Sequence, residues 1–201
     1  MKKLLLSMVA VATFAFTTQA QTEKGNTMLG GNVGFNSSKT DGAAKADVNF
    51  RIVPTVGYFV SDNFAIGTGI GYNYYKKVST NNLNQALEVS PFGRYYLDLS
   101  DQFKFFGQLS VPMAFGNNKL VDNEGNVADD KYASTTRIGV NFAPGFAFFP
   151  TKRIGIELSV NGLDYNNYTV KNELTGNKVE TNSFGLDANT FAPKLGVMFH
   201  F

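Results

Sequence analysis

The chain has 201 residues, a length typical of a single domain. It contains 20 Gly, 19 Phe and 9 Tyr but no Cys, so disulfides and thiolate metal sites are excluded. Its 18 basic and 16 acidic residues leave a formal charge of +2, which provides no basic field for nucleic acid.

The first twenty residues have the pattern of an export signal. Lys2 and Lys3 are followed by an uncharged apolar run and by Thr-Gln-Ala at 18–20, which ends in the small residue of a cleavage site. The run has about 13 residues, whereas a bilayer-spanning helix needs about 20, which disfavours an uncleaved anchor. We expect a cleavable signal peptide over residues 1–20 and a mature domain over 21–201. That domain carries 16 basic and 16 acidic residues, because the two lysines are the signal's only charges.

Apolar residues alternate with small or polar residues along the mature chain, which predicts β-strands with two different faces. The first half contains four such runs, at 29–36, 48–58, 64–74 and 87–99. The second half contains four more, at 103–115, 137–148, 154–161 and 190–201. Most are long enough for a tilted strand to cross a bilayer.

Short and long links alternate between these runs. The short links are polar turns at 61–63, 100–102 and 150–152. The long links are rich in Asn, Asp, Lys and Gly and lie near 37–46, 77–86, 116–134 and 164–183. This asymmetry is typical of an outer-membrane barrel, with periplasmic turns and long external loops. An even number of strands then places both termini on the periplasmic side.

Prolines recur at similar places on the even-numbered strands. They are Pro54, Pro91, Pro144 and Pro193. Because proline within a sheet is typical of an edge or a bulge, these residues predict a repeated irregularity in the barrel wall.

The polar face of the strands is rich in glycine, as in the run Gly67, Gly69 and Gly71. A water-facing surface has no need of glycine, whereas the narrow interior of an eight-stranded barrel does. Aromatic residues also form two bands, one near the turns and one near the loops, as at the two membrane interfaces. Both features favour an apolar face in lipid over a soluble barrel or sandwich. We predict an all-β fold, an eight-stranded antiparallel up-and-down transmembrane β-barrel in a bacterial outer membrane.

The alternating strands, the Gly67-Gly69-Gly71 run and the terminal strand over 194–201 resemble the small eight-stranded outer-membrane barrels of the OmpX and OmpA membrane-domain type. The likeness extends over essentially the whole mature chain. Phe199 and Phe201 resemble the terminal signal that the barrel-assembly machinery reads. The resemblance implies outer-membrane lipid, this machinery and periplasmic chaperones as partners, with an extracellular ligand at the long loops. The family's roles are diverse, so membership names no single function.

Charged residues on the polar face form the main candidate site. They are Arg51, Glu88, Arg94, Asp98, Lys104, Arg137, Glu157 and Lys194. Charges enclosed in a narrow interior must pair, so we expect a salt-bridged polar network that fills the lumen and blocks flow. The alternative is a narrow channel for ions or small solutes, for which eight strands leave little room.

Sites for catalysis, metals and nucleotides are not predicted. The single histidine, His200, lies beside the C-terminus without an evident Ser or Asp partner, which disfavours a lipid-modifying enzyme. Asp122, Glu124 and the Asp129-Asp130 pair do not match EF-hand spacing, which favours a solvated acidic loop over a Ca²⁺ site. The Gly-x-Gly runs do not open helices, so no cofactor is expected. The leading hypothesis is a non-enzymatic outer-membrane barrel whose long loops serve adhesion, surface interaction or envelope structure.

Overall fold

The computed structural model describes residues 22–39, 41, 45–187 and 194–201, so the expected signal peptide lies outside the described residues. These residues contain no helix long and apolar enough to cross a membrane. They form eleven strands and one 3₁₀ turn, Val78–Thr80. The strands are β1 (Thr27–Ser38), β2 (Asp47–Ser61), β3 (Phe64–Lys77), β4 (Asn82–Asp98), β5 (Phe103–Ser110), β6 (Met113–Val121), β7 (Val127–Thr151), β8 (Ile154–Ser159), β9 (Gly162–Asn172), β10 (Lys178–Asp187) and β11 (Lys194–His200).

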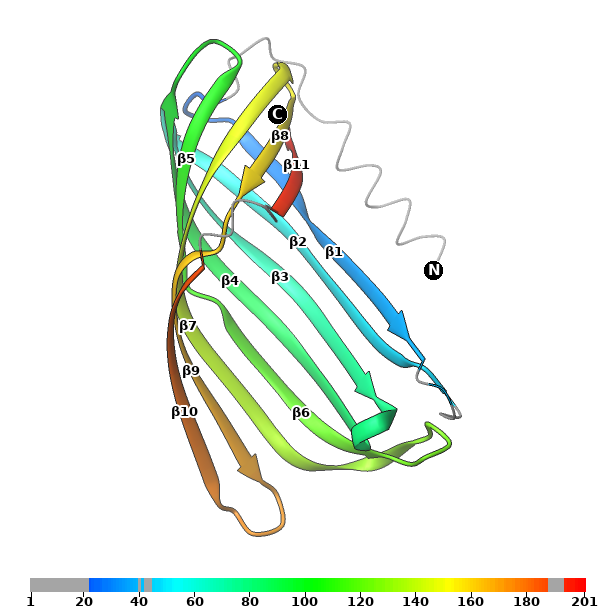
Figure 1. Cartoon of the computed structure of the whole chain (residues 1–201). Helices are drawn as coiled ribbons and strands as arrows, with labels where there is room; N and C mark the ends of the chain where they lie inside the picture. Colours follow the sequence, from blue (N-terminus) through cyan, green and yellow to red (C-terminus); the bar gives the residue numbers. More distant parts are fainter. Residues whose placement is uncertain (1–21, 40, 42–44, 188–193) are drawn as a thin grey trace.

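Three pairs of consecutive strands lie end to end, so the eleven strands occupy eight positions in the barrel wall, all antiparallel (Figure 1). We call each position a wall strand. β5 and β6 follow each other along one wall strand between β4 and β7, β8 and β9 share the next, and β10 and β11 share the last. β1 pairs with β11 at Met28 and Leu29, which closes the barrel. The predicted closed eight-stranded antiparallel barrel is confirmed. Beyond Leu29, β1 pairs with β2 alone within the part of the chain that the structure describes.

The interruptions of the wall strands coincide with prolines. β4 changes partner from β6 to β5 at Pro91, and Pro112 lies between β5 and β6. β7 changes partner from β9 to β8 at Pro144, and the pairing of β2 with β3 skips Pro54. Proline has no backbone N–H to donate, so a ladder bond is lost wherever it enters a sheet. The predicted wall irregularity is present at these positions, while Pro193 lies outside the described residues.

The described apolar residues of the runs mostly point away from the lumen, as the alternation predicts. Large apolar side chains that are exposed on this outer face include Val33, Phe35, Val56, Ile66, Ile70, Leu87, Leu97, Leu109, Phe115, Val140, Phe146, Leu158, Leu195 and Val197. Near the turns, the rings of Phe103 and Phe148 stack with centroids 4.7 Å apart. So much contiguous apolar surface is unfavourable in water and suits lipid.

The prediction of long loops is wrong for three of the four long links. The link expected near 77–86 is only the 3₁₀ turn and Asn81, since β4 begins at Asn82. β6 and β7 are joined by residues 122–126 and β9 and β10 by residues 173–177, so most of the expected loops at 116–134 and 164–183 is paired strand.

Polar cross-strand pairs explain why these strands continue. Asn84 Nδ2 donates to Asn118 Oδ1 at 2.7 Å, and Gln85 Nε2 donates to Asn117 Oδ1 at 3.1 Å. Such pairs stabilise neighbouring strands without an apolar stripe. The loop end of the barrel is therefore a set of polar hairpins, and hydrophobic alternation does not detect them.

Candidate functional site

Large side chains close the lumen at the end that carries the short turns. Phe59, Tyr96, Phe106 and Phe149, from four different wall strands, are fully buried and point inward. Ring centroids lie 5.9 Å apart between Phe59 and Tyr96 and 5.7 Å apart between Tyr96 and Phe106. These distances allow favourable tilted packing of the rings. We call these four side chains the aromatic layer.

The alternation places the aromatic layer on the polar face of the strands, which is also the glycine-rich face. Tyr96 is two residues from Arg94, so both side chains share a face of β4. The glycines and the rings also fit each other. A Cβ added at Gly145 would overlap the ring of Phe106, and one added at Gly67 would overlap the ring of Phe92. At these two positions the glycines of the polar face make room for aromatic rings.

A buried ion pair covers the aromatic layer. Arg94 Nη1 donates to Glu157 Oε1 at 2.6 Å and to the Tyr96 hydroxyl at 2.9 Å, and Arg94 Nε donates to Gln108 Oε1 at 2.8 Å. The guanidinium carbon lies 4.4 Å from the centroid of the Phe106 ring. The charged side chains are only 7% and 9% exposed. A buried pair is tolerated when further hydrogen bonds support it, as those to Tyr96 and Gln108 do here.

A second ion pair lies at the turn end itself. Lys104 pairs with Asp98 and also donates to the Thr22 hydroxyl at 2.9 Å. Asn63 Nδ2 donates to Asp98 at 3.2 Å, and the Asn63 backbone N–H donates to the Thr22 carbonyl at 2.8 Å. The first described residues therefore cover the turn end of the lumen.

His200 lies at the same end and packs against the aromatic layer. Its ring centroid is 5.2 Å from that of Phe149 and 5.9 Å from that of Phe59. The side chain is almost fully buried, and its surroundings are aromatic. This packing fits a structural role in closing the barrel base.

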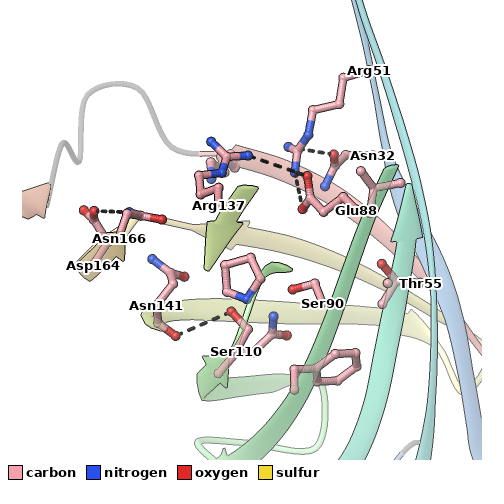
Figure 2. Close-up of a pocket in the computed structure, with 16 residues that line it drawn as sticks. Asn32, Arg51, Thr55, Glu88, Ser90, Ser110, Arg137, Asn141, Asp164 and Asn166 are labelled. Carbon is pink, nitrogen blue, oxygen red and sulfur yellow. Dashed lines mark hydrogen bonds and ion pairs between the residues drawn. The ribbon is translucent and has the colours of Figure 1, made fainter. Parts of the chain in front are cut away.

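A third charged group lies in the loop half of the lumen. Arg51 Nη2 donates to Glu88 Oε1 at 3.0 Å, and Arg137 reaches Glu88 Oε2 at 4.0 Å (Figure 2). Asn73 Nδ2 donates to the same carboxylate at 2.9 Å. Lys194 lines a cavity of the lumen together with Arg51, Glu88 and Arg137. The eight charged residues of the candidate site thus lie in three groups, at the turn end, above the aromatic layer and in the loop half.

The loop half of the lumen is hollow, in contrast to the filled turn half. One cavity of about 300 Å³ and one of about 590 Å³ both have Arg51 and Arg137 in their walls. The side chains of Arg51 and Arg137 are 43% and 46% exposed although they point inward. Solvent therefore reaches Arg51 and Arg137 in the loop half, whereas the Arg94–Glu157 pair is buried.

The acidic link 122–126 is a local hydrogen-bonded turn. Asp122 accepts hydrogen bonds from the Asn126 backbone N–H at 2.8 Å and from Asn126 Nδ2 at 2.9 Å. These bonds hold the pKa of the Asp122 carboxyl below its ordinary value, because they stabilise the charged form. Within the described residues, no three His, Asp or Glu side chains are grouped as a metal site requires.

The predicted assembly-signal residues lie on the strand that closes the barrel. Phe199 pairs with Leu29 of β1 and is exposed on the outer face. The backbone N–H of Phe201 donates to the Thr27 carbonyl at 2.9 Å, and that of Thr27 donates to the Phe201 carbonyl at 2.8 Å.

Comparison with known proteins decides the family. Residues 4–199 match the outer membrane protein beta-barrel domain. The chain belongs to this family. It is an outer-membrane β-barrel, and its outer face exposes large apolar side chains. No curated protein matches its sequence.

Solved structures similar to this outer-membrane β-barrel are small outer-membrane proteins. OprG from Pseudomonas aeruginosa is 15% identical with a TM-score of 0.49, and the match covers 91% of this chain and 99% of that chain. The N-terminal β-barrel domain of OprF from the same organism is 15% identical with a TM-score of 0.46, covering 91% and 100%. Ail, the attachment invasion locus protein of Yersinia pestis, is 14% identical with a TM-score of 0.42, covering 89% and 99%.

Proposed function

We propose that this outer-membrane barrel is a non-conducting, non-enzymatic surface protein that presents its hairpin end outside the cell for adhesion, surface interaction or envelope structure. The observation that carries the proposal is the closed turn half of the lumen. The rings of the aromatic layer and the Arg94–Glu157 pair are buried in this half of the lumen. A barrel closed in this way acts through its surface and its loop-end cavity, not through transport.

The proposed orientation places the short turns and both termini in the periplasm. The described chain begins and ends at the turn end, where Thr22 contacts Asn63 and Phe201 pairs with Thr27 (Figure 1). Short periplasmic turns are the rule in bacterial outer-membrane barrels. The polar hairpins β6–β7 and β9–β10 then face the outside.

Cysteine labelling tests this orientation. Because the sequence has no native Cys, only the introduced cysteine can react. Glu124→Cys lies in the exposed link of the β6–β7 hairpin, and Asp101→Cys lies in an exposed short turn. We expect a membrane-impermeant maleimide to label Glu124→Cys on intact cells and Asp101→Cys only after the outer membrane is permeabilised. The reverse pattern would contradict the proposed orientation.

The proposed partners follow from the same surfaces. The exposed apolar side chains on the outer face support contact of the barrel wall with outer-membrane lipid. The outward Phe199 near the end of the closing strand supports recognition of that strand by the barrel-assembly machinery, after delivery by periplasmic chaperones.

A narrow channel is the second candidate, and the hollow loop half of the lumen favours it. Flow would require movement of the aromatic layer, because its buried rings span the lumen. Single-channel recording separates the two functions. A lipid-modifying activity is tested by comparing the lipids of cells with and without the protein.

A further inference from the structure

Two hollows in the loop half of the lumen share two lining arginines and are considered together as one candidate site. Arg51 and Arg137 stand in the walls of both, and the volumes of about 300 and 590 Å³ fall within the range of small-molecule sites. The wall strands β2, β4, β6 and β7 supply most of the lining residues. Side chains on paired strands are held in place, so the site is preformed.

The charges that solvent reaches in this site are mainly positive. Arg51, Arg137 and Lys194 line the cavity together with two acids, Glu88 and Asp164. The Glu88 side chain is only 5% exposed, whereas both arginines are nearly half exposed. The carboxylate therefore lies beneath the guanidinium groups, and a cavity with low-dielectric walls concentrates their field.

Arg137 has hydrogen-bond donors to spare. Its contact with Glu88 is 4.0 Å long, and its side chain donates no hydrogen bond to any described residue. Arg51, in contrast, is held by Glu88 and by Asn32, which accepts from Nη1 at 3.3 Å (Figure 2). A guanidinium group presents five N–H donors in a planar fork that matches a carboxylate or phosphate group. Arg137 is thus positioned to bind an anionic group that enters the cavity.

The remaining walls suit a ligand with many hydroxyl groups. The larger cavity is lined by Asn49, Asn73, Asn84 and Tyr168. Each side-chain amide both donates and accepts hydrogen bonds, as each sugar hydroxyl does. The partly exposed ring of Tyr168 offers an apolar face and a polar edge to the same ligand.

We propose that this cavity binds a small hydroxyl-rich anion, such as a sugar acid, with its acidic group on Arg137 and Arg51. The ligand enters from the loop end, because the Arg94–Glu157 pair and the aromatic layer close the other end. The same acidic sugar chemistry occurs in free sugars and in polysaccharides, and the test distinguishes these sources.

The test is calorimetric titration of the complete mature barrel, refolded in detergent without lipopolysaccharide. The probes are D-glucuronate, its neutral analogue D-glucose, and an oligogalacturonate as the polymeric source. We expect glucuronate to bind at low salt, more weakly as salt rises, and glucose not to bind. Binding of the monomer indicates a free solute, and binding of the oligomer alone indicates a polysaccharide. Binding of neither acid, or equal binding of glucose, would overturn the proposal.

Variants assign the binding to the cavity. Arg137→Gln is expected to weaken binding about ten-fold or more, as loss of a charge-assisted hydrogen bond does. The affinity of Arg137→Lys should lie between those of the wild type and Arg137→Gln, because lysine keeps the positive charge but lacks the planar set of guanidinium donors. Lys131→Gln removes a positive charge that pairs with Glu173 near the β7 hairpin, outside the cavity, and should leave the affinity unchanged.

A folding control accompanies each variant. Heat-dependent mobility on a detergent gel shows whether the barrel has formed. Glu88 keeps Arg51 and Asn73 as partners when Arg137 is replaced, so we expect the variant to fold. A folded Arg137→Gln variant with wild-type affinity would place the ligand elsewhere and refute the assignment.

Discussion

Glu157→Gln is expected to destabilise the folded barrel by about 3–5 kcal/mol, because it removes the counter-ion of a buried Arg94. The arginine would keep its charge, while the carboxylate that accepts its 2.6 Å hydrogen bond would become a neutral amide. Denaturant unfolding in lipid vesicles, followed by the gel mobility of folded and unfolded chains, measures the change in the free energy of unfolding.

Two further variants show whether the loss comes from burial of an unpaired charge. The double variant Arg94→Met/Glu157→Leu removes both charges and should recover much of the lost stability. Glu173→Gln breaks the Lys131–Glu173 pair near the hairpin end, where solvent screens both charges, and should change stability little. Wild-type stability of Glu157→Gln would contradict the buried-pair account.

Phe106→Ala is expected to cost about 3–5 kcal/mol, since it opens a cavity within the aromatic layer. It also removes the ring that lies 4.4 Å from the Arg94 guanidinium carbon. The same unfolding measurement checks this result. The matched control is Leu174→Ala in the β9–β10 link, where the side chain is 89% exposed and should contribute little.

A smaller replacement separates volume from aromatic character. Phe106→Leu retains much of the buried volume and should cost less than Phe106→Ala. If Phe106→Ala were no more destabilising than Leu174→Ala, the layer would not be a packed core.

Period-two alternation predicted the wall strands and their faces because one face meets lipid and the other the lumen. A slip of one residue would move an entire apolar set, such as Ile66 and Ile70, to the wrong face. The pattern is therefore strong in the membrane-facing part of each strand. It fades in the polar hairpins, where Asn84 and Asn118 pair across strands, and loops were predicted there instead.

The contacts of the candidate site depend on register, which alternation does not define across distant strands. Arg94 and Glu157 are 63 residues apart and meet only after the barrel closes. The sequence predicted that both side chains face the lumen, but it did not predict that they form an ion pair with each other. It likewise showed the glycines of the inner face without the rings that they accommodate, such as Phe106 beside Gly145.

The division of the lumen into a filled and a hollow half links structure to function. The filled half contains the buried aromatic layer, which we propose prevents flow, while the hollow half offers exposed arginines to solvent. A site that is open at one end allows binding without transport. This division is the basis on which we propose a surface protein and not a channel.

Single-channel recording of the refolded barrel in a planar bilayer tests the closed lumen most directly. The wild-type barrel should show no stable open steps at any applied voltage. A folded Phe59→Ala/Phe106→Ala variant, which removes two rings of the aromatic layer, serves as the opened comparison. Stable conductance steps from the wild-type barrel would contradict the closed lumen and favour a channel.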